Sequence, residues 1–255
     1  MQITQLRLAL NNLRRSVQEV LRNRGVEVRK VPTSFEPIPV FRLAVEALMS
    51  RRGDALSFVQ VGANDGVFVD PLRQYILTRG WSGILVEPQA DVFERLKENY
   101  ADCADRLIFE NVAVSLSSQL ELFLPPADLG THDPRHAHSV VSNNAVVLAK
   151  TMNVTEARLR RVTVPAVTLD ELLSRHNFTH LDLLQIDAEG YDWEVLRTLN
   201  MKKIKPTLIQ FESGPLNRHD LNAVVNHLSE SGYLVYYGGY QGDALAMQRD
   251  FFEFI

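Results

Sequence analysis

From residue 58 to residue 237, short runs of apolar, β-prone residues alternate with stretches that have the periodicity of helices. Strands that are apolar along nearly their whole length are typical of a parallel sheet with helices on both faces. Parallel neighbours need right-handed crossover connections, so the pattern predicts an α/β fold with a doubly wound, mostly parallel sheet. The predicted strands cover residues 58–61, 84–87, 107–114, 183–187, 207–212 and 233–237, and residues 244–254 are a candidate closing antiparallel strand. The predicted helices cover residues 40–52, 70–79, 89–99, 190–199 and 217–230.

The composition is that of an ordinary globular protein, and it argues against several classes of protein. The chain has 255 residues, of which 45% are hydrophobic and 23% charged, which is enough for one large α/β domain. Its formal net charge of −4 gives no overall attraction to nucleic acid. Cys103 is its one cysteine, so the chain can form no intrachain disulfide and no thiolate metal cluster. Because there is no apolar run near the ~20 residues of a membrane span and no signal-peptide pattern, we expect a cytoplasmic protein.

The first 30 residues differ from the rest of the chain. Apolar residues recur there at alternating steps of three and four, which predicts an amphipathic helix. The same segment carries seven basic residues and two acids. Three interpretations remain open: peripheral binding to the inner face of an anionic membrane, pairing with a second copy in a homodimer, and docking on the protein's own domain. Prolines at positions 32, 37 and 39 mark a linker, so we predict a helical extension over residues 1–56 and one main domain over residues 57–255.

Polar residues follow the predicted strands where each strand ends. In a parallel sheet the carboxyl ends of the strands lie at one edge, and such folds bind their ligands there. A single acid at a strand end is common, but here acids occupy four of five consecutive ends, and we predict one site built from these residues. The site comprises Gly62, Asn64, Asp65 and Gly66 after the first strand, Glu87 and Pro88 at the second, Asn111 in the third, Asp187 and Glu189 at the fourth, and Glu212 at the fifth.

The glycine turn VGANDG narrows the choice of ligand. A Walker-type phosphate loop would have a lysine and a Ser or Thr after its last glycine, but Val67 and Phe68 follow Gly66. A dinucleotide fingerprint needs three glycines in the spacing G-x-G-x-x-G, and this turn has two. Asp65 would repel a phosphate at the helix N-terminus and attract a cation. Since Glu87 is placed to accept both hydroxyls of a ribose, we expect a nucleoside with a cationic, phosphate-free tail, a description that S-adenosylmethionine meets.

The same residues resemble a known family. The stretches FVQVGANDG, GILVEP, NVAVS, VTLDELL and LLQIDAEGYDWEVL occur in this order, and together they resemble the FkbM family of S-adenosylmethionine-dependent methyltransferases over residues 57–255. The resemblance implies a class I methyltransferase sheet with its last strand antiparallel, and O-methylation of a saccharide or small-molecule acceptor. It also implies cofactor roles: Gly62, Ala63, Asn64, Asp65 and Gly66 at the methionine part, Glu87 at the ribose, and Asn111, Val112 and Ala113 at the adenine. We expect Pro88, next to Glu87, to contact the cofactor as well.

Residues 125–161 lie outside the parts that resemble the family, and they include a histidine-rich stretch. His132, His136 and His138 fall within seven residues. Three histidines could ligate a metal, but Pro134 interrupts any helix that would align the first two, so we expect no metal. Long loops within compact domains are often functional, which favours a lid that binds the acceptor or supplies a base. A solvent-facing polar loop is the alternative.

Methyl transfer to an alcohol requires alignment, exclusion of water and a general base. Asp187 is the first candidate for the base or for positioning the acceptor, and His138 is its main rival. Asp187 is also a candidate for binding the cofactor. Glu189 is another catalytic candidate, with capping of the following helix as the alternative. Glu212 could bind the acceptor or steady the lid. Two other functions remain open: a non-catalytic nucleoside-binding or membrane-associated scaffold protein, and an NAD-dependent oxidoreductase.

Overall fold

A computed structural model describes residues 39–126, 141–237 and 243–251 of the chain. These residues belong to one compact unit that begins at Pro39. The predicted amphipathic helix of the first 30 residues and the three histidines between 132 and 138 lie outside the described residues. Within the described ranges, no helix is both long enough and apolar enough to cross a membrane.

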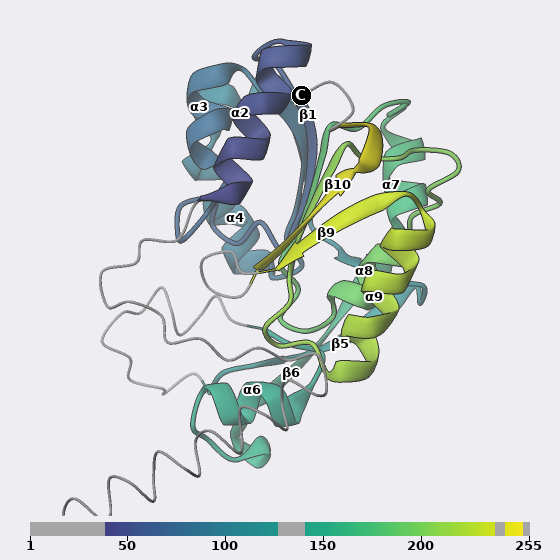
Figure 1. Ribbon diagram of the computed structural model, residues 1–255. Helices are drawn as coiled ribbons and strands as arrows, with labels where there is room; N and C mark the ends of the chain where they lie inside the picture. Colours follow the sequence, from purple (N-terminus) through teal and green to yellow (C-terminus); the bar gives the residue numbers. More distant parts are fainter. Residues whose placement is uncertain (1–38, 127–140, 238–242, 252–255) are drawn as a thin grey trace, which may run out of the picture. The chain divides into compact units, whose positions relative to one another are not determined.

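The central sheet consists of seven strands: β1 (Ser57–Val61), β2 (Ser82–Val86), β3 (Leu107–Glu110), β7 (Leu183–Ile186), β8 (Leu208–Glu212), β9 (Tyr233–Tyr237) and β10 (Asp243–Gln248). Their order in the sheet is β3-β2-β1-β7-β8-β10-β9 (Figure 1). All neighbours from β3 to β8 are parallel, whereas β10 runs antiparallel to both β8 and β9. The predicted α/β fold with a mostly parallel sheet is confirmed.

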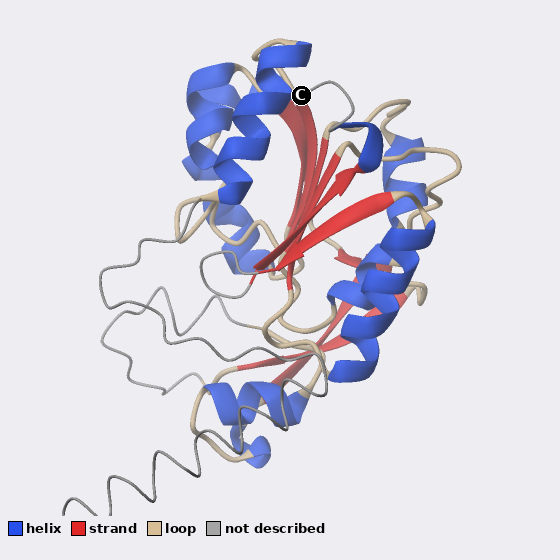
Figure 2. Ribbon diagram, viewed as in Figure 1, coloured by secondary structure: helices blue, strands red, loops and turns tan. Residues whose placement is uncertain are grey.

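Helices cover both faces of this sheet, as Figure 2 shows. One face carries α2 (Val40–Arg52), α3 (Arg73–Arg79) and α4 (Ala90–Asn99), and the short helix η1 (Ala101–Arg106) follows α4. The other face carries α7 (Leu169–Arg175), α8 (Asp192–Leu196) and α9 (Arg218–Glu230). Successive strand side chains point to opposite faces, so Phe58 enters the first core and Val59 the second.

Helix α2 belongs to the main domain. Its residues Ala44, Val45, Leu48 and Met49 are buried in the same core as Phe58. Burying an aliphatic side chain of this kind contributes roughly 1.5–3 kcal/mol. The compact unit therefore includes residues 40–52 and begins earlier than the predicted boundary at residue 57.

A second sheet has three strands, β4 (Ala113–Val114), β5 (Gln119–Leu124) and β6 (Arg160–Val167), in the order β4-β6-β5. The prediction of one strand over residues 107–114 is wrong, because the chain leaves the large sheet after Glu110 and Ala113 pairs with Ala166. The antiparallel pair β5 and β6 encloses the predicted insertion. The described part of this insertion contains α6 (Ala145–Thr151) and η2 (Glu156–Arg158), and Figure 1 shows α6, β5 and β6 beyond one end of the large sheet.

Two predicted elements have different bounds in the structure. The predicted helix 190–199 is the shorter α8, because Glu189 and Gly190 have positive φ angles of 50° and 92°. Residues in the left-handed region cannot continue a right-handed helix. The predicted strand 244–254 is β10, which ends at Gln248 and is followed by the short helix η4 (Arg249–Phe251).

Candidate functional site

A cavity of about 370 Å³ lies at the carboxyl ends of β1, β2, β7 and β8. Small-molecule sites have volumes of this order. The second sheet and the insertion contribute Leu120, Leu122, Val141 and Asn143 to its wall. The predicted site residues that line it are Gly62, Ala63, Asn64, Glu87, Pro88, Val112, Ala113, Asp187, Glu189 and Glu212. Asp65, Gly66 and Asn111 are not part of the lining, and His138 lies outside the described residues.

The turn after β1 approaches the end of β7 very closely. Gly62 has a φ of 80°, and a Cβ atom at this position would lie 1.9 Å from the backbone oxygen of Asp187. Only glycine fits here without a shift of the backbone. Asn64 has a φ of 51°, which asparagine tolerates better than most residues. The glycine therefore lets the turn and Asp187 form one continuous wall of the cavity.

Asp65 has a different role from the predicted one. Its Oδ1 accepts hydrogen bonds from the backbone N–H groups of Val67 and Phe68, both 2.9 Å long. Its side chain is buried within the turn and does not line the cavity. Gly66 packs under the ring of Tyr100, where a Cβ atom would lie 2.3 Å from a ring carbon. The expectation that Asp65 faces the cationic ligand is thus corrected, because its carboxylate is occupied in stabilising the turn.

Glu87 follows β2 and is only 4% exposed in the cavity wall. Its Oε2 accepts a hydrogen bond from the backbone N–H of Asn64 (3.1 Å), and its Oε1 accepts one from that of Gln89 (2.9 Å). Burial raises the pKa of Glu87 to about 7, although these hydrogen bonds oppose the shift. Each oxygen keeps further lone-pair capacity for a ligand hydroxyl. The side-chain amide of Asn111 donates to the backbone oxygen of Glu87 (2.8 Å), so Asn111 holds this strand end in place from outside the lining.

The raised pKa of Glu87 predicts a pH-dependent stability. The protonated carboxyl favours the folded state, so its contribution is complete below the ordinary pKa of 4.5 and is lost as the pH rises through about 7. We expect the free energy of unfolding of the ligand-free protein, measured relative to that of Glu87→Gln, to fall over this window by about 3 kcal/mol at most. Urea titrations of both proteins at several pH values measure the difference. A difference that stays constant with pH would contradict the shift.

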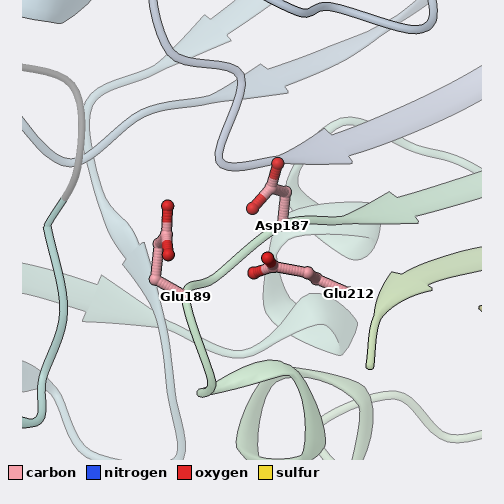
Figure 3. Close-up of side chains that lie close together, drawn as sticks. All are labelled: Asp187, Glu189 and Glu212. Carbon is pink, nitrogen blue, oxygen red and sulfur yellow. The ribbon is translucent and has the colours of Figure 1, made fainter. Parts of the chain in front are cut away.

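Three carboxylates lie close together, as Figure 3 shows. Asp187 follows β7, Glu189 lies in the next loop, and Glu212 is the last residue of β8. One oxygen from each lies within 4.8 Å of the other two. We call these three residues the acidic cluster. The structure therefore brings together the acids from two strand ends that the sequence predicts to share a site.

Burial raises the pKa values of all three residues of the acidic cluster. Burial raises the pKa of Glu189 to about 7, and the charge of Asp187 adds to the shift. Burial also raises the pKa of Glu212, and the charges of Asp187 and Glu189 raise it further. The side chain of Asp187 is exposed where it borders the cavity, yet the surrounding protein still desolvates it and raises its pKa. Carboxylates with raised pKa values in a cleft are typical of sites that exchange protons or bind cations.

Glu189 does not cap α8. The N-cap position is Tyr191, and no side chain caps it. The positive φ of Glu189 instead turns the chain so that its side chain lines the cavity. Its backbone oxygen accepts a hydrogen bond from the hydroxyl of Ser142 (3.2 Å), which ties the insertion to this loop.

The sequence analysis missed a row of buried glutamines. Gln60, Gln185 and Gln210 are neighbours in β1, β7 and β8, and they are 2%, 4% and 6% exposed. Among the described residues, no donor reaches the Oε1 atom of any of the three. The amides of Gln60 and Gln210 donate to Asp70 (3.0 Å) and Asp243 (2.9 Å). A signal was present, because FVQV, LLQI and LIQF each carry one glutamine at the third position of an apolar run.

The charge of the cavity wall has one sign. Five acids line it, and the described part of the lining contains no Lys, Arg or His. Uncompensated carboxylates attract cations and repel phosphates and other anions. The acids are Asp70, Glu87, Asp187, Glu189 and Glu212.

The chain has similarity to known methyltransferases. The family model described as the methyltransferase FkbM domain matches residues 60–235. No curated protein matches the chain in sequence. The crystal structure of methyltransferase FkbM from Methylobacillus flagellatus KT is 13% identical over 76% of this chain and 44% of that one, with a TM-score of 0.48, so this chain spans less than half of that protein.

Two other solved structures are similar over most of their length. Precorrin-6y C5,15-methyltransferase from Geobacter metallireducens GS-15 is 11% identical, with 86% of this chain and 93% of that one covered and a TM-score of 0.44. Cofactor-bound Rv0187 from MTB is 14% identical, with 86% and 84% covered and a TM-score of 0.45.

Proposed function

Because the chain belongs to the FkbM methyltransferase family, we propose that it transfers a methyl group from S-adenosylmethionine to a hydroxyl group of a saccharide or small molecule. The observation that supports this proposal best is the cavity wall, which has five acids and, among its described residues, no basic side chain. S-adenosylmethionine matches such a wall, since it carries a sulfonium and an ammonium group, a ribose and no phosphate.

The residues present fit this cofactor. Glu87 has oxygen lone pairs left for the ribose hydroxyls. Val112 and Ala113 give the wall an apolar part that suits the adenine. Gly62, Ala63 and Asn64 would hold the methionine part against the end of β7. When bound, the cofactor supplies a methyl group that its positive sulfur already activates, so the protein needs no covalent intermediate.

The protein's own contribution is alignment, exclusion of water and removal of a proton. The apolar side chains Leu120, Leu122 and Val141 border the cavity and would exclude water from the acceptor. A carboxylate oxygen of Asp187 would take the proton of the acceptor hydroxyl. A base is most effective when its pKa lies near the working pH, and the raised pKa of Asp187 moves it in that direction.

The charge of the wall also limits the acceptor. Without a bound cation, the acidic cluster would repel a phosphorylated or carboxylated acceptor. The same argument disfavours nucleic acid, whose backbone is anionic, and NAD, which carries a pyrophosphate. A neutral hydroxylated compound, such as a saccharide, avoids this repulsion.

Thermal unfolding tests the choice of ligand. At a hundredfold excess over its Kd, a ligand stabilises the folded state by about 2.7 kcal/mol. For a domain of this size that corresponds to a rise in Tm of roughly 5–10 °C. We expect this rise with S-adenosylmethionine and with its demethylated product, and no rise with NAD. Stabilisation by NAD alone would contradict the methyltransferase function. If S-adenosylmethionine stabilises the protein, a labelled methyl donor with a panel of saccharides would identify the acceptor.

A further inference from the structure

The spacing of the acidic cluster suits a single metal ion. The ligand oxygens of Asp187, Glu189 and Glu212 all lie within 4.8 Å of one another. Three oxygens spread evenly in a plane around one ion are about 4.0–4.5 Å apart for Ca²⁺ and about 3.5–3.6 Å apart for Mg²⁺. Small rotations of the three side chains would bring the cluster to either spacing.

A neighbouring glutamine provides an independent reason to expect a ligand. Gln185 is 4% exposed and lines the same cavity, two residues before Asp187 on the same face of the chain. Within the described residues, its carbonyl oxygen Oε1 accepts no hydrogen bond. The buried Oε2 of Glu212 lacks a donor in the same way. Buried oxygens without a partner cost free energy unless a ligand satisfies them.

We propose that the acidic cluster, together with Oε1 of Gln185, binds one hard divalent cation such as Ca²⁺, Mg²⁺ or Mn²⁺. All four groups offer oxygen atoms, which these ions prefer. An alkylammonium group offers only three N–H donors and one positive charge. It would leave one of the four acceptors unsatisfied and would neutralise less of the cluster's charge than a divalent ion does.

The cation would act on the methyl acceptor. This role rests on the proposed methyltransferase function, but binding of the ion is independent of that function. An acceptor oxygen bound to the ion would be held in place, and its hydroxyl would have a lowered pKa. The O–H bond then breaks and the proton moves to the Asp187 oxygen that does not bind the ion. The acceptor oxygen keeps the electron pair of that bond and would use it to form the bond to the methyl carbon, while the carbon–sulfur bond breaks and the sulfur of the demethylated product keeps its pair.

Ion binding can be measured without cofactor or acceptor. The full chain, freed of metals with EDTA and then of EDTA by dialysis, is titrated in a calorimeter with CaCl₂, MgCl₂ and MnCl₂. We expect one of these ions to bind at one site per chain. Glu189→Gln removes one charged ligand and should weaken binding about tenfold or more. The Tm of this variant without ions checks that it folds.

Glu194→Gln is the matched control. Glu194 lies in α8, outside the cavity lining, and pairs with Arg197 (3.0 Å), so ion binding should not change. If none of the three ions binds at millimolar concentration, or if Glu189→Gln and Asp187→Asn both bind as well as the unaltered protein, the cation site is wrong. Methyl transfer at full rate in EDTA would overturn the role of the ion toward the acceptor and leave the methyltransferase function standing. If the ion binds and S-adenosylmethionine does not, the cation site is supported and the proposed methyltransferase function is contradicted.

Discussion

Asp187→Asn lowers methyl-transfer turnover about 10²–10⁴-fold while the affinity for S-adenosylmethionine stays close to that of the unaltered protein. Asparagine keeps the shape of the side chain but can neither take a proton nor carry the charge of the acidic cluster. Loss of proton transfer to a positioned base has an effect of this size. Because Asp187 lines the cavity at the end of β7 and Glu87 lies after β2, the change leaves the proposed ribose contacts untouched.

Single-turnover rates and equilibrium titrations of the same preparation separate the two effects. Asp54→Asn is a suitable control, since Asp54 forms a surface ion pair with Arg79 (3.4 Å) and does not line the cavity. We expect it to leave both rate and affinity unchanged. A variant at Asp187 that turns over normally but binds the cofactor poorly would assign the residue to cofactor binding instead of proton removal.

Glu87→Ala weakens the binding of S-adenosylmethionine about 30-fold, which corresponds to about 2 kcal/mol. The change removes up to two hydrogen bonds to a charged acceptor, each worth roughly 1.5–3 kcal/mol, and water recovers part of the loss at the ribose. Titration calorimetry measures the change directly. Unaltered affinity in a folded Glu87→Ala variant would contradict the ribose assignment.

The control for Glu87 is Glu94→Ala on the neighbouring helix α4. Glu94 pairs with Lys97 at the surface (2.9 Å) and lies outside the cavity lining. Exposed pairs of this kind contribute about 1 kcal/mol or less to stability. Equal losses of affinity in the two variants would therefore indicate a general effect on the fold and not a contact with the ribose.

The sheet and the position of the site were predictable because each central strand carries its own signal. The strands β1, β2, β7 and β8 are apolar along their length and end in a glycine turn or an acid. Parallel strands bring those ends to one edge, so Glu87, Asp187 and Glu212 had to lie near one another. The resemblance of the motifs to the FkbM family is confirmed by the family model over residues 60–235.

The direction of individual side chains was not predictable from the pattern. Asp65 sits between two glycines in a turn, and its hydrogen bonds to Val67 and Phe68 depend on a local geometry that spacing does not reveal. Asn111 belongs to a segment where the chain changes from one sheet to the other, so apolar periodicity continues although the strand ends. The left-handed conformation of Glu189 shortens α8 for a similar local reason.

The second sheet had a signal that was overlooked. Leu120, Leu122 and Leu124 alternate in QLELFL, as do Val162 and Val164 in RRVTVPAV, and such alternation is typical of half-buried strands. Likewise, the Thr168 and Glu171 side chains form a capping box at the start of α7, a pattern that is readable as TLDE. These strands form one side of the cavity, so the predicted elements did not include the wall that faces the strand ends.

A crystal structure with the demethylated cofactor product bound tests directly which ligand the cavity binds. We predict density for an adenosine in the cavity of the large sheet, with both ribose hydroxyls donating to Glu87 and the amino-acid part along the turn from Gly62 to Asn64. Density for this compound at another place on the protein would show that the wall of carboxylates does not select a cationic, phosphate-free nucleoside. A diphosphate bound in the cavity beside the acidic cluster would show the same.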